Sequence, residues 1–184
     1  NVSIKRKQDA YSSCINNDTI IMNGRVTYCT HHYYGDGGEG MSFGAKLQIK
    51  TDGELSHDHS TITVTDATYV IVYSAFETNY DVNKFDIDEA SDFKIKLNKT
   101  IENLVNTDYE KIKETHISTH QKWFCNVELN LEETEFSSLP TNKRLKELNW
   151  DEYDPDLFAL YYNFGRYLLI ESSGKNARLP ANLQ

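Results

Sequence analysis

The chain has 184 residues, and its 19 lysines and arginines are outnumbered by 28 aspartates and glutamates, which gives a formal net charge of -9. Because a protein that binds the nucleic-acid backbone needs clustered basic charge to release counterions, this balance argues against a nucleic-acid partner. Hydrophobic residues make up 39% of the chain and aromatic residues 12%, which is enough for a core and excludes disorder throughout. The uncharged stretch 157–165 is far shorter than the roughly 20 apolar residues of a transmembrane helix, so no membrane partner is expected.

The N-terminus has neither an initiator methionine nor the basic-then-apolar order of a signal peptide. We therefore expect a segment of a longer protein, and these residues assign no cellular compartment. The three cysteines, Cys14, Cys29 and Cys125, are widely spaced and form no Cys-x-x-Cys pair, so free thiols are the favoured interpretation. A disulfide between Cys14 and Cys29 is the alternative, since both lie in a strand-rich region.

The first half of the chain has the pattern of short strands. Asn23-Gly24 lies between β-rich runs and predicts a hairpin at about 18–29. The glycine-rich segment 35–40 precedes no helix start and no P-loop lysine, which favours a turn over a phosphate-binding loop. Alternation predicts a strand over 43–49, and Asp52-Gly53 predicts a turn. Two more strands are expected, one at Ile62 and Val64 and one at 69–76, the latter buried on both faces.

The second half mixes strand and helix patterns. Phe93, Ile95 and Leu97 alternate and predict one more strand. Apolar residues then recur at spacings of three and four from Leu104 to Phe124, which predicts a single helix of about six turns. After it we expect a short strand at 127–131 and, beyond Pro140, a short helix over 142–148.

The last helix has the clearest boundaries. Asp154 is a good N-cap, Pro155 suits the first helical position, and Gly174 can end the helix. Its body, 157–172, is apolar on nearly every side. Because a helix that is apolar all round is buried by neighbours on several sides, and the chain offers few other helices, a further helical domain is expected. Without it, the chain is predicted to self-associate or to bind apolar dyes.

Several segments, in order, resemble one family. They are 67–80, 116–131, 139–145 and, above all, YNFGRYLLI at 162–170 and LPANLQ at 179–184. Together they look like glycoside hydrolase family 95, the bacterial and plant α-L-fucosidases. The resemblance covers roughly 40–184, and the last block is its specific part.

The resemblance implies an α+β chain made of three parts. Residues 1–100 would form part of an antiparallel β-super-sandwich, 101–150 a helical linker with a returning strand, and 151–184 the start of an (α/α)6 catalytic barrel. The implied activity of the parent protein is hydrolysis of terminal α-L-fucosides or α-L-galactosides with inversion and without a cofactor. Its partners would be the oligosaccharide substrate and the remaining barrel of the same protein.

The resemblance places no catalytic residue in this chain. Family members use a glutamic acid to protonate the leaving oxygen and an Asn-x-Asn motif, polarised by an aspartate, to activate water. These groups would follow Gln184, so the 184 residues alone are predicted to be inactive. Asn182 and Gln184 are candidate substrate-binding residues, because they would lie where the family's pocket opens. The alternative is that they fix the loop by bonding backbone groups.

His116 and His120 have the four-residue spacing of two zinc ligands on one helix face. Residue 117 is isoleucine rather than glutamate, so the metalloprotease pattern fails, and packing between the helix and the sandwich is favoured over a metal site. Two other functions for the whole protein stay open. One is a carbohydrate-binding or assembly module without catalysis, and the other is a disaccharide phosphorylase of similar architecture.

Overall fold

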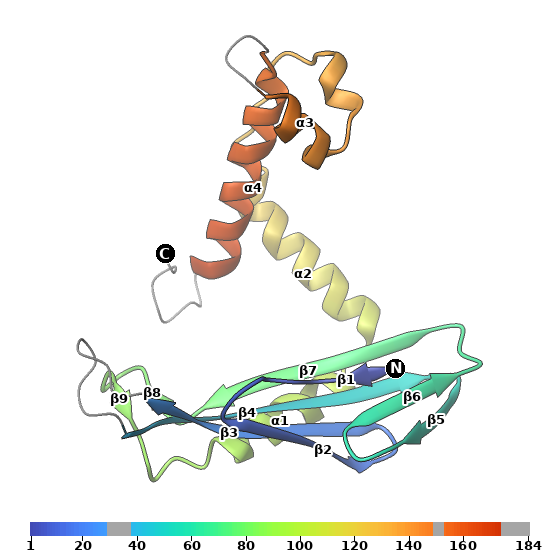
Figure 1. Ribbon diagram of the computed structural model, residues 1–184, viewed down its shortest axis with the longest axis vertical. Helices are drawn as coiled ribbons and strands as arrows, with labels where there is room; N and C mark the ends of the chain where they lie inside the picture. Colours follow the sequence, from blue (N-terminus) through green and yellow to red (C-terminus); the bar gives the residue numbers. More distant parts are fainter. Residues whose placement is uncertain (29–37, 149–152, 174–184) are drawn as a thin grey trace. The chain divides into compact units, whose positions relative to one another are not determined.

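The computed structural model describes residues 1–28, 38–148 and 153–173. The chain divides into two compact units, Asn1–Asp108 and Tyr109–Gln184, which we call the strand unit and the helical unit. Each unit is described by itself. The chain is a mixed α+β protein with antiparallel sheets (Figure 1).

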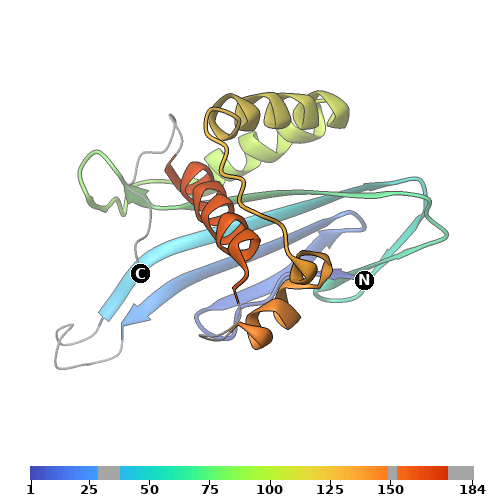
Figure 2. The same ribbon diagram turned by 90° about the horizontal axis from the view of Figure 1, so that it is seen from above.

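The strand unit is built on a four-stranded antiparallel sheet of order β2-β3-β4-β7. A three-stranded sheet of order β1-β6-β5 packs on one of its faces, and a small β8-β9 pair follows β7. Figure 2 shows the long strands β3 and β4 running side by side. The bounds are β1 Val2–Ser3, β2 Ala10–Asn16, β3 Thr19–Tyr28, β4 Gly38–Thr51, β5 Glu54–His57, β6 Thr61–Thr65, β7 Val70–Thr78, β8 Tyr80–Asp81 and β9 Asp86–Ile87.

The core between the two sheets follows from alternation. Leu47 and Ile49 of β4 point to the same face, as predicted, and they join Ile20 of β3 and Ile62 of β6 in one buried cluster. Lys46 and Gln48, which alternate with Leu47 and Ile49, point to the other face and are only partly buried. The predicted strands at 43–49 and around Ile62 and Val64 are therefore confirmed.

The chain leaves the large sheet after β4, forms β5 and β6, and returns as β7. The predicted turn at Asp52-Gly53 starts this detour. Asp52 also closes it, because its carboxylate accepts hydrogen bonds from the backbone N–H groups of Thr68, at 3.0 Å, and Tyr69, at 3.2 Å. The Thr68 hydroxyl donates to the same carboxylate. β4 and β7 consequently lie next to each other in the sheet although the detour separates them in sequence.

The predicted hairpin turn at Asn23-Gly24 is wrong. β3 continues through both residues, and the turn between β2 and β3 falls at 17–18. Gly24 is required for another reason: a Cβ atom there would lie 2.2 Å from the Asp9 backbone oxygen and 2.3 Å from Cζ of Phe43. The glycine therefore permits a close approach within the sheet.

The strand predicted at Phe93, Ile95 and Leu97 is helix α1, Phe93–Val105. Phe93 and Leu97 are buried together with Ile101, whereas Ile95 is 67% exposed. The four-residue spacing of the buried residues is that of a helix, and the Asp92 carboxylate caps the first turn by accepting from the Lys94 N–H at 3.1 Å. α1 covers the face of β4 and β7 opposite the three-stranded sheet (Figure 1).

β7 was expected to be buried on both faces, but only one face is buried. Tyr73 and Ala75 are buried, whereas Val72 is 42% exposed and Phe76 is 65% exposed. The reason is that β7 ends the four-stranded sheet, while the three-stranded sheet packs over Ile20 of β3 and Leu47 and Ile49 of β4.

The single helix expected from Leu104 to Phe124 is two helices. α1 ends at Val105, and Asn106 serves as its C-cap, with its N–H donating to the Glu102 carbonyl. A new helix then begins at Tyr109. The helical unit contains α2 Tyr109–Phe124, the 3-10 turn η1 Glu135–Ser138, α3 Thr141–Glu147 and α4 Pro155–Ser173. None of the helices within the described ranges is sufficiently long and apolar to pass through a membrane.

The short strand predicted at 127–131 does not form. This segment pairs with no strand among the described residues, and its carbonyls accept hydrogen bonds from side chains of α4 instead. Asn163 donates to the Leu129 carbonyl at 3.2 Å and Arg166 to the Val127 carbonyl at 2.7 Å. Alternation here reflects an extended segment lying along a helix.

Candidate functional site

Helix α4 begins where the sequence predicts. Pro155 is its first residue, and the Asp154 carboxylate accepts a hydrogen bond from the Leu157 N–H at 3.1 Å. Asp154 is thereby confirmed as the N-cap, satisfying one of the backbone donors that a helix start leaves unpaired. The short helix expected after Pro140 is α3, Thr141–Glu147.

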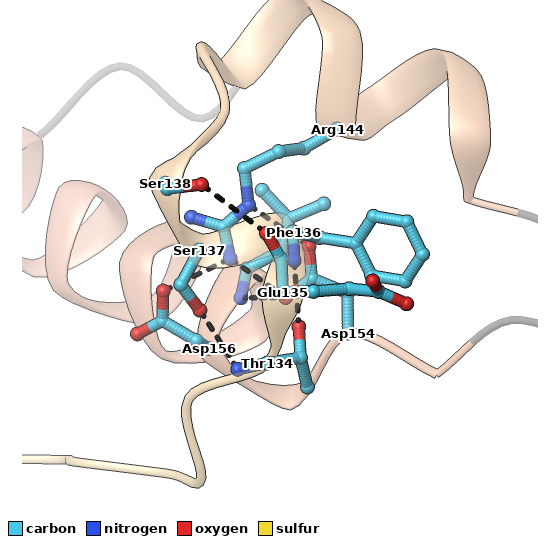
Figure 3. A network of polar contacts seen from close by, with 9 residues as sticks. Thr134, Glu135, Phe136, Ser137, Ser138, Arg144, Asp154 and Asp156 are labelled. Atoms are coloured by element: carbon cyan, nitrogen blue, oxygen red, sulfur yellow. Dashed lines mark hydrogen bonds and ion pairs between the residues drawn. The ribbon is translucent and has the colours of Figure 1, made fainter.

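A buried ion pair joins α3 to the start of α4 (Figure 3). Arg144 donates from Nε to Asp154 Oδ2 at 2.8 Å and from Nη2 to Asp154 Oδ1 at 2.6 Å. Nη2 also donates to Asp156 Oδ2 at 2.9 Å. The side chains of Arg144 and Asp154 are each 5% exposed. A bidentate pair of this kind is strong and fixes the geometry of both partners.

The electrostatics of this pair exclude Asp154 as a proton donor. The hydrogen bonds from Arg144 hold the pKa of the Asp154 carboxyl below its ordinary value, and burial opposes this shift without reversing it. The same contacts raise the pKa of the Arg144 guanidinium. Because both carboxylate oxygens are already occupied, Asp154 can position α4 but cannot serve as the general acid of a hydrolase.

The η1 turn lies beside this pair, as Figure 3 shows. Thr134 and Ser137 form a reciprocal capping box, in which each side chain accepts from the backbone N–H of the other. The Ser138 hydroxyl donates to the Glu135 carbonyl at 3.2 Å. The entry to α3 and the start of α4 are thus held by local polar contacts rather than by a large apolar core.

Arg166 ties the middle of α4 to the end of α2. Its Nη2 donates to the Phe124 carbonyl at 2.8 Å, and its guanidinium carbon lies 4.9 Å from the centre of the Phe124 ring. A cation is favourable at this end of a helix, because the last carbonyls are unpaired and carry partial negative charge.

His120 contacts α4, whereas the sequence placed it against the sandwich. Its Nδ1 lies 2.9 Å from Oε1 of Glu171, and its ring is stacked with that of Phe124 at 5.2 Å between centroids. The rings of His116 and His120 also stack, at 6.3 Å. Within the described residues, no three side chains among histidine, cysteine, aspartate and glutamate come together as metal ligands.

The surface of α4 is mostly apolar and uncovered. Its buried residues are Pro155, Leu157 and Ala159. A Cβ atom added to Gly165 would meet no heavy atom within 4 Å, so this side of the helix faces open space. Large apolar residues along the helix are exposed by 43% to 78%: Phe158, Leu160, Tyr161, Tyr162, Phe164, Tyr167, Leu168 and Leu169.

Some predicted residues lie outside the described ranges. These include both candidate sugar contacts, Asn182 and Gln184, as well as Cys29 and Gly174. Cys14 and Cys125 carry free thiols.

Sequence reasoning missed the roles of Arg144 and Arg166. For Arg166 a signal was available, because it is the first charge after the uncharged run 157–165 in an otherwise apolar helix. Charged side chains in apolar surroundings need partners, which here are the carbonyls at the end of α2. Arg144 gave no such signal, since it stands among other polar residues.

Comparison with known proteins identifies relatives of the chain. Residues 108–184 match the glycosyl hydrolase family 95 catalytic domain. The chain is 27% identical over 158 residues to alpha-L-fucosidase 2 of Arabidopsis thaliana, which covers 81% of this chain and 18% of that protein. It is 28% identical over 156 residues to probable alpha-fucosidase A of Aspergillus niger, covering 79% of this chain and 19% of the relative.

The chain thus spans about a fifth of the length of the curated relatives it matches. The family match begins at residue 108, next to the boundary between the two units at 108 and 109. These matches confirm the resemblance predicted from the sequence: residues 108–184 are similar to the catalytic domain of glycoside hydrolase family 95.

Proposed function

We propose that the chain is part of an inverting exo-glycosidase that hydrolyses terminal α-L-fucosides, or α-L-galactosides, of oligosaccharides. The observation that carries this proposal is the family 95 catalytic-domain match over 108–184, the part of the chain that forms the helical unit. The names of the two relatives, both fucosidases, support the choice of sugar.

In this proposal residues 1–100 belong to a β-super-sandwich, 101–150 form the linker, and 151–184 begin an (α/α)6 barrel. α4 would be the first barrel helix. Its exposed apolar side chains support this assignment, because a helix that is apolar on several sides needs neighbours on those sides. Those neighbours would be the remaining barrel helices of the same protein.

The role of this chain's residues is positional. Arg144, Asp154 and the η1 turn fix where α4 begins, and Arg166 fixes its middle against α2. Segment 174–184 would then leave a helix whose position is already set. Asn182 and Gln184 would use that position to contact the sugar, while the catalytic acid and the water-activating residues would be supplied by later parts of the protein.

The first experiment measures L-fucose released from 2′-fucosyllactose by the 184-residue chain and by the longer parent protein under the same conditions. We expect turnover by the parent and none by the chain. Turnover by the chain alone would mean that the catalytic acid and base are within these residues. A parent protein that forms a sugar phosphate only when phosphate is added would instead be a phosphorylase.

The second experiment tests the two sugar contacts in the parent protein. Asn182→Ala and Gln184→Ala are expected to raise KM for 2′-fucosyllactose by about tenfold, which corresponds to one lost hydrogen bond of about 1.4 kcal/mol. Asn142→Ala is the matched control, because Asn142 is an exposed amide on α3. Unchanged KM and kcat in both variants would leave these residues a purely local role in the loop.

A further inference from the structure

The strand unit contains a hollow that the proposed hydrolysis does not use. It has a volume of about 550 Å³ and lies between β2, β3 and the first turn of α1. This volume falls within the usual range for small-molecule sites. Its polar lining residues are Asp9, Asn23, Arg25, Ser42 and Lys94, and its aromatic ones are Tyr11 and Phe93.

One wall of the hollow is held in a fixed position by close backbone packing. The Arg25 N–H donates to the Asp9 carbonyl at 3.1 Å, and Gly24 allows this approach because it has no Cβ. Asp9 has a φ of 62°, in the left-handed region that residues other than glycine seldom occupy. Such strain is retained where the surrounding structure imposes it, and it is common at ligand sites.

The charged groups of the wall are already engaged. The Asp9 carboxylate accepts from the Thr27 hydroxyl at 2.6 Å, and the Thr27 hydrogen bonds hold the pKa of Asp9 below its ordinary value. Arg25 donates to the Gly40 carbonyl at 3.0 Å and pairs with Glu39 and Glu89. These groups therefore bond to one another, and the positive charge of Arg25 is balanced by the two glutamates.

The floor, in contrast, presents polar groups without partners. Tyr11 and Asn23 face each other in the β2–β3 register, so their side chains lie on the same face of the sheet. Tyr11 is 66% exposed. The Tyr11 hydroxyl, the Asn23 amide and the Lys94 ammonium make no hydrogen bond or ion pair with any residue in the described ranges. An uncovered aromatic ring beside free donors and acceptors is what a sugar ring requires, because its C–H face is apolar and its edge carries hydroxyls.

We propose that this hollow binds one neutral pyranose of an oligosaccharide. The sugar's C–H face would pack on the Tyr11 ring, and its hydroxyls would bond to Asn23, Lys94 and Asp9. A phosphate or sulfate is disfavoured, because Asp9 lines the hollow and Arg25 is neutralised by two glutamates. The site lies wholly in the strand unit, and its existence does not depend on the proposed hydrolysis.

The test uses the 184-residue chain and saturation-transfer and amide-shift NMR. The probes are 2′-fucosyllactose, lactose and maltotriose, each titrated to about 50 mM, because single-sugar contacts commonly give millimolar affinity. We expect transfer to at least one probe, with shifts at residues 9–11, 23–25 and 93–94. Tyr11→Ala should weaken binding at least about tenfold, and Tyr11→Phe should weaken it less, because the ring is retained.

Two further variants separate binding from folding. Tyr69→Ala is the matched control. Tyr69 is also a partly exposed tyrosine, at 44%, but it directly precedes the first residue of β7 and does not line the hollow. Lys94→Gln removes an exposed ammonium that has no partner in the described parts of the chain, so weaker binding in this variant reports a lost sugar contact even if Tyr11→Ala unfolds the protein.

Three results would overturn the proposal. One is that no probe shows saturation transfer, and another is that Tyr11→Ala and Lys94→Gln both bind as the unaltered chain does. The third is that sodium phosphate, rather than any sugar, shifts the amides around the hollow. None of these results bears on fucose release by the parent protein, so this proposal and the proposed hydrolysis fail separately.

Discussion

The strand unit and the helical unit keep their apolar side chains in different places. In the strand unit, residues of β3, β4 and β6 form one buried cluster between the two sheets, and one face of α1 is buried against the opposite face of the large sheet. In the helical unit, α2 has no buried residue. The buried apolar residues among the described part of this unit are Pro155, Leu157 and Ala159, all in α4.

Polar contacts take the place of that core in the helical unit. Arg144 holds Asp154, Arg166 holds the carbonyls at the end of α2, and His120 contacts Glu171. Polar contacts can therefore hold the helices of this unit in place while much of the apolar surface of α4 stays exposed. The strand unit depends on packing, whereas the helical unit depends on a few directed bonds.

The largest expected effect tests that dependence on directed bonds. Arg144→Ala should destabilise the helical unit by about 3–5 kcal/mol, because it leaves the Asp154 carboxylate buried without its partner. Urea unfolding followed by circular dichroism at 222 nm, which is dominated by helix, measures the loss. Lys143→Ala, an exposed neighbour on α3, is the control and should change stability by less than about 0.5 kcal/mol. Equal stability of the two variants would show that the pair contributes little.

Acid should remove part of the same contribution. The folded-state pKa of Asp154 lies below its ordinary value of 3.8, so its stabilisation is complete above that pH and is lost as the pH falls through the lowered folded-state value. Helical signal should therefore fall below about pH 4. The double variant Arg144→Met with Asp154→Leu replaces both charges by apolar groups and should show a weaker acid dependence. An identical pH profile in the double variant would contradict this assignment.

A smaller effect is expected at a glycine of the strand unit. Gly24→Ala should destabilise the chain by about 1–3 kcal/mol, because the new Cβ would overlap the Asp9 carbonyl and the Phe43 ring. The measurement is the thermal midpoint followed by strand signal. An unchanged midpoint would mean that the contact between Asp9 and β3 relaxes freely.

The smallest effect has the opposite sign and lies in α4. Gly165→Ala should stabilise the 184-residue chain by about 0.5–1 kcal/mol, since alanine favours a helix and its Cβ would meet nothing here. In the parent protein the same change should reduce stability, if a neighbouring helix packs closely at Gly165. Stabilisation in both proteins would argue against close packing at this position.

Much of the local structure could be predicted from the sequence. Alternation in 43–49 identified β4, and Asp154-Pro155 identified the start of α4, because each signal is local and had no rival. The strand predicted from Phe93, Ile95 and Leu97 was wrong, because this short run fits both a strand and a helix. Only the spacing to Ile101, four residues beyond Leu97, distinguishes them.

The missed features depend on contacts between distant residues. Asn23-Gly24 has the composition of a turn, but its role is set by Asp9 and Phe43, which the local sequence does not bring together. The hollow needs β2, β3 and α1 to meet, and Arg144 needs Asp154 ten residues later. The predicted sugar contacts Asn182 and Gln184 lie outside the described residues, so they stay predictions.

The carboxylate of Asp52 has a consequence for the order in which the strand unit assembles. Its hydrogen bonds hold together the two ends of the segment that contains β5 and β6. β4 and β7 can therefore pair as the two strands of a simple hairpin do. The entropy of closing a loop grows only slowly with its length. Lengthening or shortening the tip between β5 and β6 should therefore leave the rate of sheet formation nearly unchanged, whereas loss of Asp52 should slow it.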